Sequence, residues 1–397
     1  MLHSVTLRRS VKHMQAYVLL ALPRAIITTS MNEEPLLPKK PKFWTKLHDW
    51  IHRHPTATYI IAGVGLILIA SLVTLAVLYQ RPVEVATPIV KKHTPKPALA
   101  VKYYSPLTGL LVDNEAATKQ AVTAIMIENS PDARPQSGIK QAGVVYEAIA
   151  EGGITRFLTL HQQDKPQLIG PVRSVRMYYV DWLAPYNASV AHVGGSAAAL
   201  AEVRNGSYRD IDQFFNAGTY WRATDRYAPH NVYTSFEKLD ALNQAKGYTT
   251  SDFTGFSRVD GKPSDAPTAT SVAINFGGAL YNTTYAYDKV SNSYARSEAG
   301  EPHLDREDGQ ISPNVVIAMH VDMSLVMQDG NREDITTTGS GDATIFQNGT
   351  AQNVTWHKAS RAGQLNFTDE AGKDVPLVRG QTWIAAVPNG NGNVSWQ

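Results

Sequence analysis

The chain has 397 residues, of which 43% are hydrophobic and 18% are charged, and its net charge is +2. This composition is typical of a globular protein with a sizeable core, and so slight a positive charge does not predict nucleic-acid binding. The sequence contains no cysteine, which excludes disulfides, thiolate zinc sites and cysteine nucleophiles. An exported domain without disulfides is more typical of bacteria than of animals.

The N-terminal region divides into two parts. Residues 1–30 are rich in Arg and Ser and poor in acids, whereas Met31 begins a more ordinary tail. We therefore predict that Met31 is the true start and that residues 1–30 are a spurious upstream extension. Residues 31–55 are predicted to form a basic cytoplasmic tail, which carries Lys39, Lys40, Lys42, Lys46 and Arg53.

The most hydrophobic segment runs from Tyr59 to Tyr79 without a charged residue. It is long enough to cross a bilayer as one helix, and it is longer than the apolar core of a cleaved signal peptide. We predict a transmembrane helix over residues 56–79. Because the lysine and arginine excess lies before it, the predicted topology is a single pass through the cell membrane, with a cytoplasmic N-terminus and the remaining domains outside.

Residues 80–103 are rich in Pro and Lys and predict a stiff, extended stalk. The folded part begins at residue 104. Short apolar runs at residues 121–127, 154–161 and 189–193 predict buried strands, and two intervening segments predict helices, residues 175–183 and residues 197–203. Strands that alternate with helices predict an α/β domain over residues 104–250.

The composition changes after residue 250. Residues 251–270 are rich in Ser, Asp, Gly and Pro and predict a linker. Short strand-like runs separated by Asp-Gly and Asn-Gly turns then predict a mostly β domain over residues 271–397. The predicted fold class is α+β, with an α/β domain followed by a mostly β domain and preceded by one transmembrane helix.

Polar residues of the first soluble domain lie in turns beside Gly or Pro, at the ends of the predicted strands. Sheets of α/β domains build ligand crevices at such ends. The arginines could form a pocket for phosphate or carboxylate groups, or they could pair with Glu128, Glu147 and Glu151 and only hold loops together. The candidate ligand-binding residues are Asn129, Arg134, Glu151, Arg156, Arg173, Arg176, His192, Ser196, Arg226, His230 and Asn231.

No motif predicts a metal or a cofactor. No two histidines show the spacing of a metalloprotease helix, and no glycine-rich loop matches a phosphate-binding or dinucleotide fingerprint. His320 and Asp322 would share one face of a strand by simple alternation. Ser196 is better explained as the N-cap of the following helix than as a nucleophile.

Several long motifs follow one another in a fixed order. They include Glu128-Asn-Ser-Pro-Asp, Glu151-Gly-Gly-Ile-Thr-Arg-Phe, Gly170-Pro-Val-Arg-Ser-Val-Arg, His192-Val-Gly-Gly-Ser, Ala228-Pro-His-Asn, His303-Leu-Asp, Gly339-x-Gly and Gly380-Gln-Thr-Trp. This series resembles the YerB-like lipoprotein family, which is catalogued as a domain of unknown function with N-terminal and C-terminal parts. The resemblance spans roughly residues 104–388. It implies an envelope-attached protein, in which a membrane helix stands where many members carry a lipidated cysteine, and it implies no activity.

The sequence leaves three functions open. The first is a membrane-anchored extracytoplasmic protein whose first domain binds a cell-wall glycan or an anionic envelope polymer. The second is an envelope hydrolase or transferase, with His192 or His230 as the acid/base and Glu151 as its carboxylate partner. The third is a scaffold whose β domain docks a protein partner.

Overall fold

The computed structural model describes residues 42–79, 101–326 and 332–397. The chain forms two compact units, Met1–Lys96 and Pro97–Gln397, and each is described by itself. The predicted upstream extension and all but the last residues of the predicted stalk lie outside the described residues.

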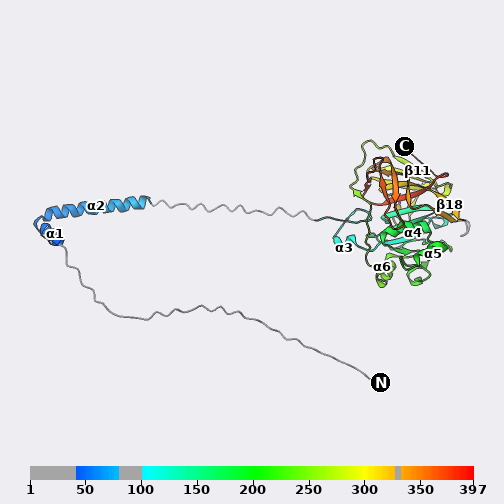
Figure 1. The fold of residues 1–397 in the computed structure, drawn as a ribbon, viewed down its shortest axis with the longest axis horizontal. Helices are drawn as coiled ribbons and strands as arrows, with labels where there is room; N and C mark the ends of the chain where they lie inside the picture. The colour runs from blue at the N-terminus through cyan, green and yellow to red at the C-terminus, as the bar shows by residue number, and fades with distance from the viewer. Residues whose placement is uncertain (1–41, 80–100, 327–331) are drawn as a thin grey trace, which may run out of the picture. The chain divides into compact units, whose positions relative to one another are not determined.

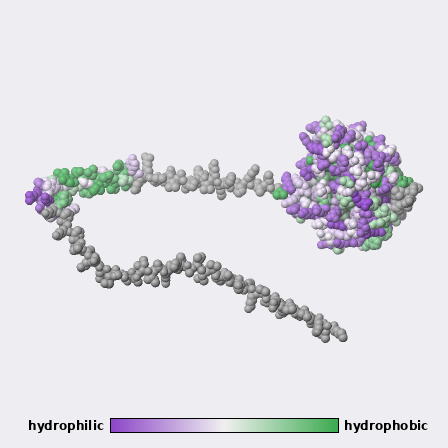
Figure 2. All heavy atoms as spheres, viewed as in Figure 1, coloured by the Kyte–Doolittle hydropathy of each residue, from purple (hydrophilic) through white to green (hydrophobic). Residues whose placement is uncertain are grey.

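Two helices form the described part of the first unit. They are α1 (Lys42–Arg53) and α2 (Pro55–Tyr79). Pro55 opens α2 because a proline suits the first position of a helix, where its missing N–H has no partner to lose. Helix α2 is long and apolar enough to cross a membrane, and none of its residues is buried; Figure 2 shows its surface as an almost continuous hydrophobic band. A helix was predicted here, whereas α1 was not.

One large sheet dominates the second unit and contains strands from both predicted domains. Strand β24, near the end of the chain, pairs in parallel with β17 on one side and with β4 on the other. All residues of β24 are buried, as expected of a central strand. The order across the sheet is β22 (Asn366–Thr368), β21 (Thr350–Lys358), β20 (Gly339–Gln347), β17 (Val315–Val321), β24 (Thr382–Pro388), β4 (Val144–Glu151), β5 (Ile154–His161), β3 (Thr123–Glu128), β6 (Ser189–Ala191) and β7 (Arg209–Asp210).

Each face of this sheet has its own core. Alternation along β3 sends Ala124 and Met126 to one core and Ile125 and Ile127 to the other. The first core is completed by helices α4 (Met177–Leu183) and α5 (Ala197–Val203), which confirms the two predicted helices. Helix α6 (Phe236–Ala245) packs against the second core. In Figure 1 these helices gather at one end of the unit and β11 lies at the other.

A second, antiparallel sheet also covers the second core. Its order is β14 (Glu301–Pro302), β13 (Ser293–Glu298), β12 (Thr283–Asp288), β11 (Ser271–Asn275) and β25 (Asn393–Trp396). The α+β class and the mostly β C-terminal region are therefore as predicted. Within the predicted linker, β10 (Arg258–Val259) pairs with β23 (Leu377–Val378).

Short elements complete the described fold. They are α3 (Glu115–Thr118), β1 (Tyr103–Tyr104), β2 (Leu111–Val112), β8 (Trp221–Arg222), β9 (Val232–Tyr233), β15 (Leu304–Asp305), β16 (Gly309–Gln310), β18 (Met323–Val326) and β19 (Arg332–Ile335), with one-turn helices at Pro131–Ala133, Ala184–Tyr186, Ala217–Thr219 and Ala279–Tyr281.

A buried ion pair ties the two sheets together. Arg296 on β13 donates from Nη2 to both carboxylate oxygens of Glu147 on β4, at 3.0 and 2.9 Å, and neither side chain is exposed. The guanidinium also lies 4.5 Å from the ring centre of Trp383, whose Nε1 donates to Glu147 at 2.9 Å. Burial raises the pKa of Glu147, while the charge of Arg296 acts in the opposite direction. The pair therefore fixes the second sheet against the first.

Candidate functional site

The residues predicted to bind a ligand lie close together, at one edge of the large sheet. Strands β3 and β6 are parallel neighbours, so the turns that follow them meet there. The chain around Arg173 crosses this edge, because its N–H donates to Met126 at 2.8 Å and its carbonyl accepts from Val193 at 3.0 Å. Although these residues lie close together, most of their charged side chains already pair with neighbouring groups of the protein.

Glu128, at the end of β3, is the centre of one group. Its Oε1 lies 3.3 Å from Arg173 Nε, 2.9 Å from His230 Nδ1 and 3.1 Å from Ser130 Oγ. The carboxylate is buried, and its Oε2 has no hydrogen-bond partner among the described residues. The side chains of Arg173 and His230 are 25% and 22% exposed, so this group touches solvent.

Glu151, at the end of β4, is the centre of a second group. Arg156 Nη2 donates to one carboxylate oxygen at 2.6 Å, and Arg176 donates to the other. Burial alone would raise the pKa of Glu151, but the two guanidinium charges outweigh it and hold the pKa below its ordinary value. Both arginines are buried. Arg156 and Arg176 therefore hold neighbouring loops together through Glu151, and their burial leaves no room for a ligand.

Helix α4 begins only at Met177, so Arg173 lies in the chain before it and does not share a helix face with Arg176. The two side chains contact different carboxylates, Glu128 and Glu151. The two arginines therefore do not project from one side of a helix.

Four further candidates, Asn129, Arg134, Arg226 and Asn231, bind neighbouring backbone and amide groups, and Asn129 and Arg134 also contact the carboxylate of Glu298. Arg134 Nε donates to Asn129 Oδ1 at 3.1 Å. Arg226 donates to two carbonyls, of Asp132 at 3.1 Å and of Pro135 at 2.6 Å. Asn231 Nδ2 donates to the carbonyl of Arg226 at 3.2 Å. These contacts shape the turns around Glu128.

His192 and Ser196 have structural partners as well. His192 is fully buried, with Nε2 3.0 Å from Asp210 Oδ1 and Nδ1 2.8 Å from the carbonyl of Gly194. Ser196 caps α5, as predicted, by accepting from the N–H of Ala199. Within the part of the chain that the structure describes, neither His192 nor His230 pairs with Glu151; their carboxylate partners are Asp210 and Glu128.

One group of side chains has donors that suit a metal ion. Ligand atoms of His192, Asp210 and Asp212 lie within 4.8 Å of one another. Arg204 already pairs with Asp212 and lies 4.0 Å from Asp210. Because this guanidinium supplies the positive charge that the carboxylates need, the group forms a complete network without an ion.

A separate cavity of about 630 Å³ opens at the far half of the large sheet, and we call it the His320 pocket. Its lining comes from β17, β20 and β21 and from the residues directly after β17, β19 and β24. The carboxyl ends of parallel strands thus meet here too. Its lining residues are His320, Asp322, Thr336, Ser340, Gly341, Asp342, Ala343, Thr344, Asn353, Val354, Trp356 and Asn389.

The pocket forms because two paired strands separate. The ladder between β17 and β20 ends at the pair Met319 and Ala343, while β17 continues beside β24 to Pro388 and β20 continues beside β21. The next residues on each strand, His320 and Asp342, therefore diverge and leave a space between them. Both line the pocket.

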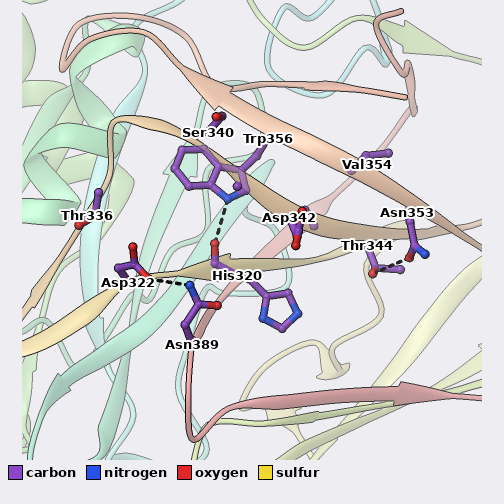
Figure 3. A pocket seen from close by; sticks show the side chains of 12 residues that line it. His320, Asp322, Thr336, Ser340, Asp342, Thr344, Asn353, Val354, Trp356 and Asn389 are labelled. Carbon is purple, nitrogen blue, oxygen red and sulfur yellow. Dashed lines mark hydrogen bonds between the residues drawn. The ribbon is translucent and has the colours of Figure 1, made fainter. Parts of the chain in front are cut away.

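Trp356 closes one wall of this space. Its Nε1 donates to the carbonyl of His320 at 2.9 Å (Figure 3). Strand β17 is no longer paired with β20 at this residue, so the indole takes the place of a strand-to-strand hydrogen bond. The indole fits because its neighbour across the strands is Gly341. A Cβ atom at Gly341 would lie 2.7 Å from Nε1 of the indole, which is too close for van der Waals contact.

The remaining walls are polar. Asn389 Nδ2 donates to Asp322 at 2.7 Å, and Thr344 donates to Asn353 at 3.1 Å. Figure 3 shows Asp342 between these two pairs. None of the 12 lining residues in the described chain is Lys or Arg, so two carboxylates set the charge of the pocket.

The sequence singled out only part of this site. His320 and Asp322 line the same pocket. Strand β17 ends at Val321, however, so Asp322 follows the strand and the predicted alternation within one strand does not account for its position. Asp342, Asn353 and Asn389 were not predicted, because the predicted ligand crevice lay in the first soluble domain. Two features of the sequence could have indicated this pocket. They are the Gly339-x-Gly motif and Asn389, the polar residue that directly follows the buried strand β24.

Comparisons with known proteins agree with the two-part organisation. Residues 107–249 match the family described as "Protein of unknown function (DUF3048) N-terminal domain", and residues 272–384 match its C-terminal domain. The chain is 33% identical over 298 residues to a protein of Bacillus subtilis named "Putative lipoprotein YerB", covering 74% of this chain and 88% of that protein. The crystal structure of YerB protein from Bacillus subtilis superposes with a TM-score of 0.66 at 30% identity, over 74% of this chain and all of that chain.

Proposed function

Because the chain belongs to the YerB-like family of proteins of unknown function, we propose that it is an envelope-attached protein that binds a neutral glycan of the cell envelope in the His320 pocket. The lipoprotein name of its relative and the apolar helix α2 support attachment to a membrane. In this proposal α2 crosses the cell membrane once, with the N-terminus in the cytoplasm and the second unit outside.

The observation that carries the proposal is the lining of the pocket. Carboxylates accept hydrogen bonds, amides both donate and accept, and hydroxyls do either. A sugar presents hydroxyl groups that can serve as partners to all three. A cavity of about 630 Å³ falls within the size range of small-molecule sites. The pocket therefore fits one or two sugar units.

Charge favours a neutral glycan over an anionic polymer. The pocket presents Asp322 and Asp342 without a cation in its lining, so a phosphate or carboxylate ligand would meet like charge. Two of the arginines predicted to attract an anion are buried against Glu151. The turn cluster is thus a poorer anion site than its sequence implies.

Binding to purified envelope material tests the proposal. Residues 97–397 form a compact unit of their own, and this part can be mixed with insoluble cell-wall glycan, either freed of anionic polymers or still carrying them. We expect Asp322→Asn and Asp342→Asn to weaken sedimentation with the neutral glycan at least several-fold. The matched control is Asp252→Asn, which removes the charge of an exposed aspartate outside the pocket.

Three outcomes would contradict the proposal. Both pocket variants could retain full binding while folded, or binding could require the anionic polymers. Arg173→Ala could instead abolish binding, since Arg173 is a partly exposed arginine of the turn cluster. Loss of binding in Arg173→Ala would indicate that the glycan binds at the ends of β3 and β6 and not in the His320 pocket.

One geometric observation favours a second candidate function, acid–base catalysis on an envelope polymer. The buried Glu128 holds Nδ1 of His230 at 2.9 Å, and Nε2 of the same ring lies 3.9 Å from Asp132, whose side chain is exposed. If this is a catalytic pair, His230→Gln abolishes release of soluble fragments from envelope glycan and Glu128→Gln reduces it. Equal turnover in wild type and His230→Gln would remove this role.

A further inference from the structure

Helix α1 has two unlike faces, and its apolar face is exposed. Phe43, Trp44, Trp50 and Ile51 are 67%, 61%, 42% and 38% exposed in the described part of the first unit. Single exposed apolar side chains are common, but a contiguous group of large ones marks an interaction surface. Figure 2 shows that α1 carries hydrophilic atoms, unlike α2.

The spacing of the apolar residues defines the face. At 100° per residue, Phe43, Trp44, Leu47, Trp50 and Ile51 fall within an arc of about 120°. The charged and histidine residues fall on the remaining arc. The helix carries Lys42, Lys46 and Arg53 against one acid, Asp49, so its net charge is positive.

The position of α1 indicates what covers this face. Only His54 separates α1 from α2, so if α2 enters a bilayer at Pro55, α1 must end at the surface of that bilayer. Trp and Phe are favoured at the membrane–water boundary. Basic residues near the surface are attracted to anionic lipids. Continuity with α2, aromatic residues on one face and positive charge on the other all fit the same partner.

We infer that α1 is an interfacial helix, which lies in the headgroup region of the leaflet where α2 begins and binds anionic phospholipids through Lys46 and Arg53. This inference rests on α2 as a membrane span and is independent of the glycan proposal. The helix would fix the depth and direction in which α2 enters the bilayer.

Single-cysteine labelling of the full chain tests this inference, because the sequence contains no cysteine. Nitroxide labels would be placed at Ile51, on the apolar face, and at Asp49, on the polar face. The chain would be reconstituted in phosphatidylcholine vesicles with and without phosphatidylglycerol. We expect the Ile51 label to be several-fold less accessible to a water-soluble relaxation agent than the Asp49 label. This difference in accessibility should be larger in vesicles that contain phosphatidylglycerol.

Two further variants separate the possible failures. A label at Leu68, in the middle of α2, reports whether α2 spans the bilayer, and a water-accessible Leu68 label would refute the premise. A deep Leu68 label with equal accessibility at Ile51 and Asp49 would overturn the inference itself. Spin–spin broadening between Ile51 labels would show that a second copy covers the face, and this would also overturn it. The combined change Lys46→Gln and Arg53→Gln should abolish the effect of phosphatidylglycerol.

Discussion

The buried histidine at the end of β5 makes the stability of the second unit depend on pH. His161 is fully buried, and its ring lies 5.2 Å from the ring of Phe236. Burial lowers the pKa of His161 from 6.5 to about 3. Below pH 6.5 the unfolded chain therefore takes up a proton that the folded chain excludes, so stability is lost as the pH falls through this range.

The size of the effect follows from the two pKa values. With an unfolded pKa of 6.5 and a folded pKa of about 3, linkage predicts a loss of about 2 kcal/mol in the free energy of unfolding between pH 7.5 and pH 5. At pH 3 the loss reaches about 4 kcal/mol. Other groups add to the total, so only the difference between wild type and a variant at His161 isolates this contribution.

Urea unfolding of residues 97–397 at pH 7.5 and pH 5 measures that difference. In His161→Leu, the decline in stability between the two values should be smaller than in wild type by about 2 kcal/mol. The control is Phe236→Leu, which alters packing beside the same ring but keeps the imidazole, and it should keep the wild-type pH dependence. An equal decline in wild type and His161→Leu would refute the reasoning.

Three further changes test other parts of the fold. Arg296→Met leaves the carboxylate of Glu147 buried and unpaired and should lower the free energy of unfolding by about 3–5 kcal/mol in urea titrations; a loss below 1 kcal/mol would contradict this. Gly341→Ala forces the indole of Trp356 to move and should cost about 1–3 kcal/mol and weaken glycan sedimentation; unchanged binding would show that this wall is not needed. Glu151→Gln should lower stability more at pH 7 than at pH 3, because the contribution of a carboxylate with a lowered pKa is full above its unfolded pKa and is lost as the pH falls through its folded pKa; an equal loss at both values, measured by urea unfolding, would oppose this.

Local patterns in the sequence predicted much of the secondary structure. The uncharged run before Tyr79 predicted the helix α2, and the run from Ile154 to His161 coincides with β5. Ser196 caps the helix that its neighbours predicted. The amphipathic pattern of α1 was equally visible in the sequence, but the region was interpreted only as a basic tail. Such signals can be used because periodicity and capping involve residues within a few positions of one another.

The sequence by itself thus determined the family, the α+β class, the apolar helix and the gathering of polar turns at one edge of the sheet. Only the tertiary structure decided which charges are paired. Arg156 and Arg176 close on Glu151, and Arg296 reaches Glu147 from 149 positions away. It also placed β24 between β17 and β4 and separated β17 from β20, which opens the His320 pocket. Strand partners and ion pairs depend on residues far apart in the chain, whose distances no local periodicity encodes.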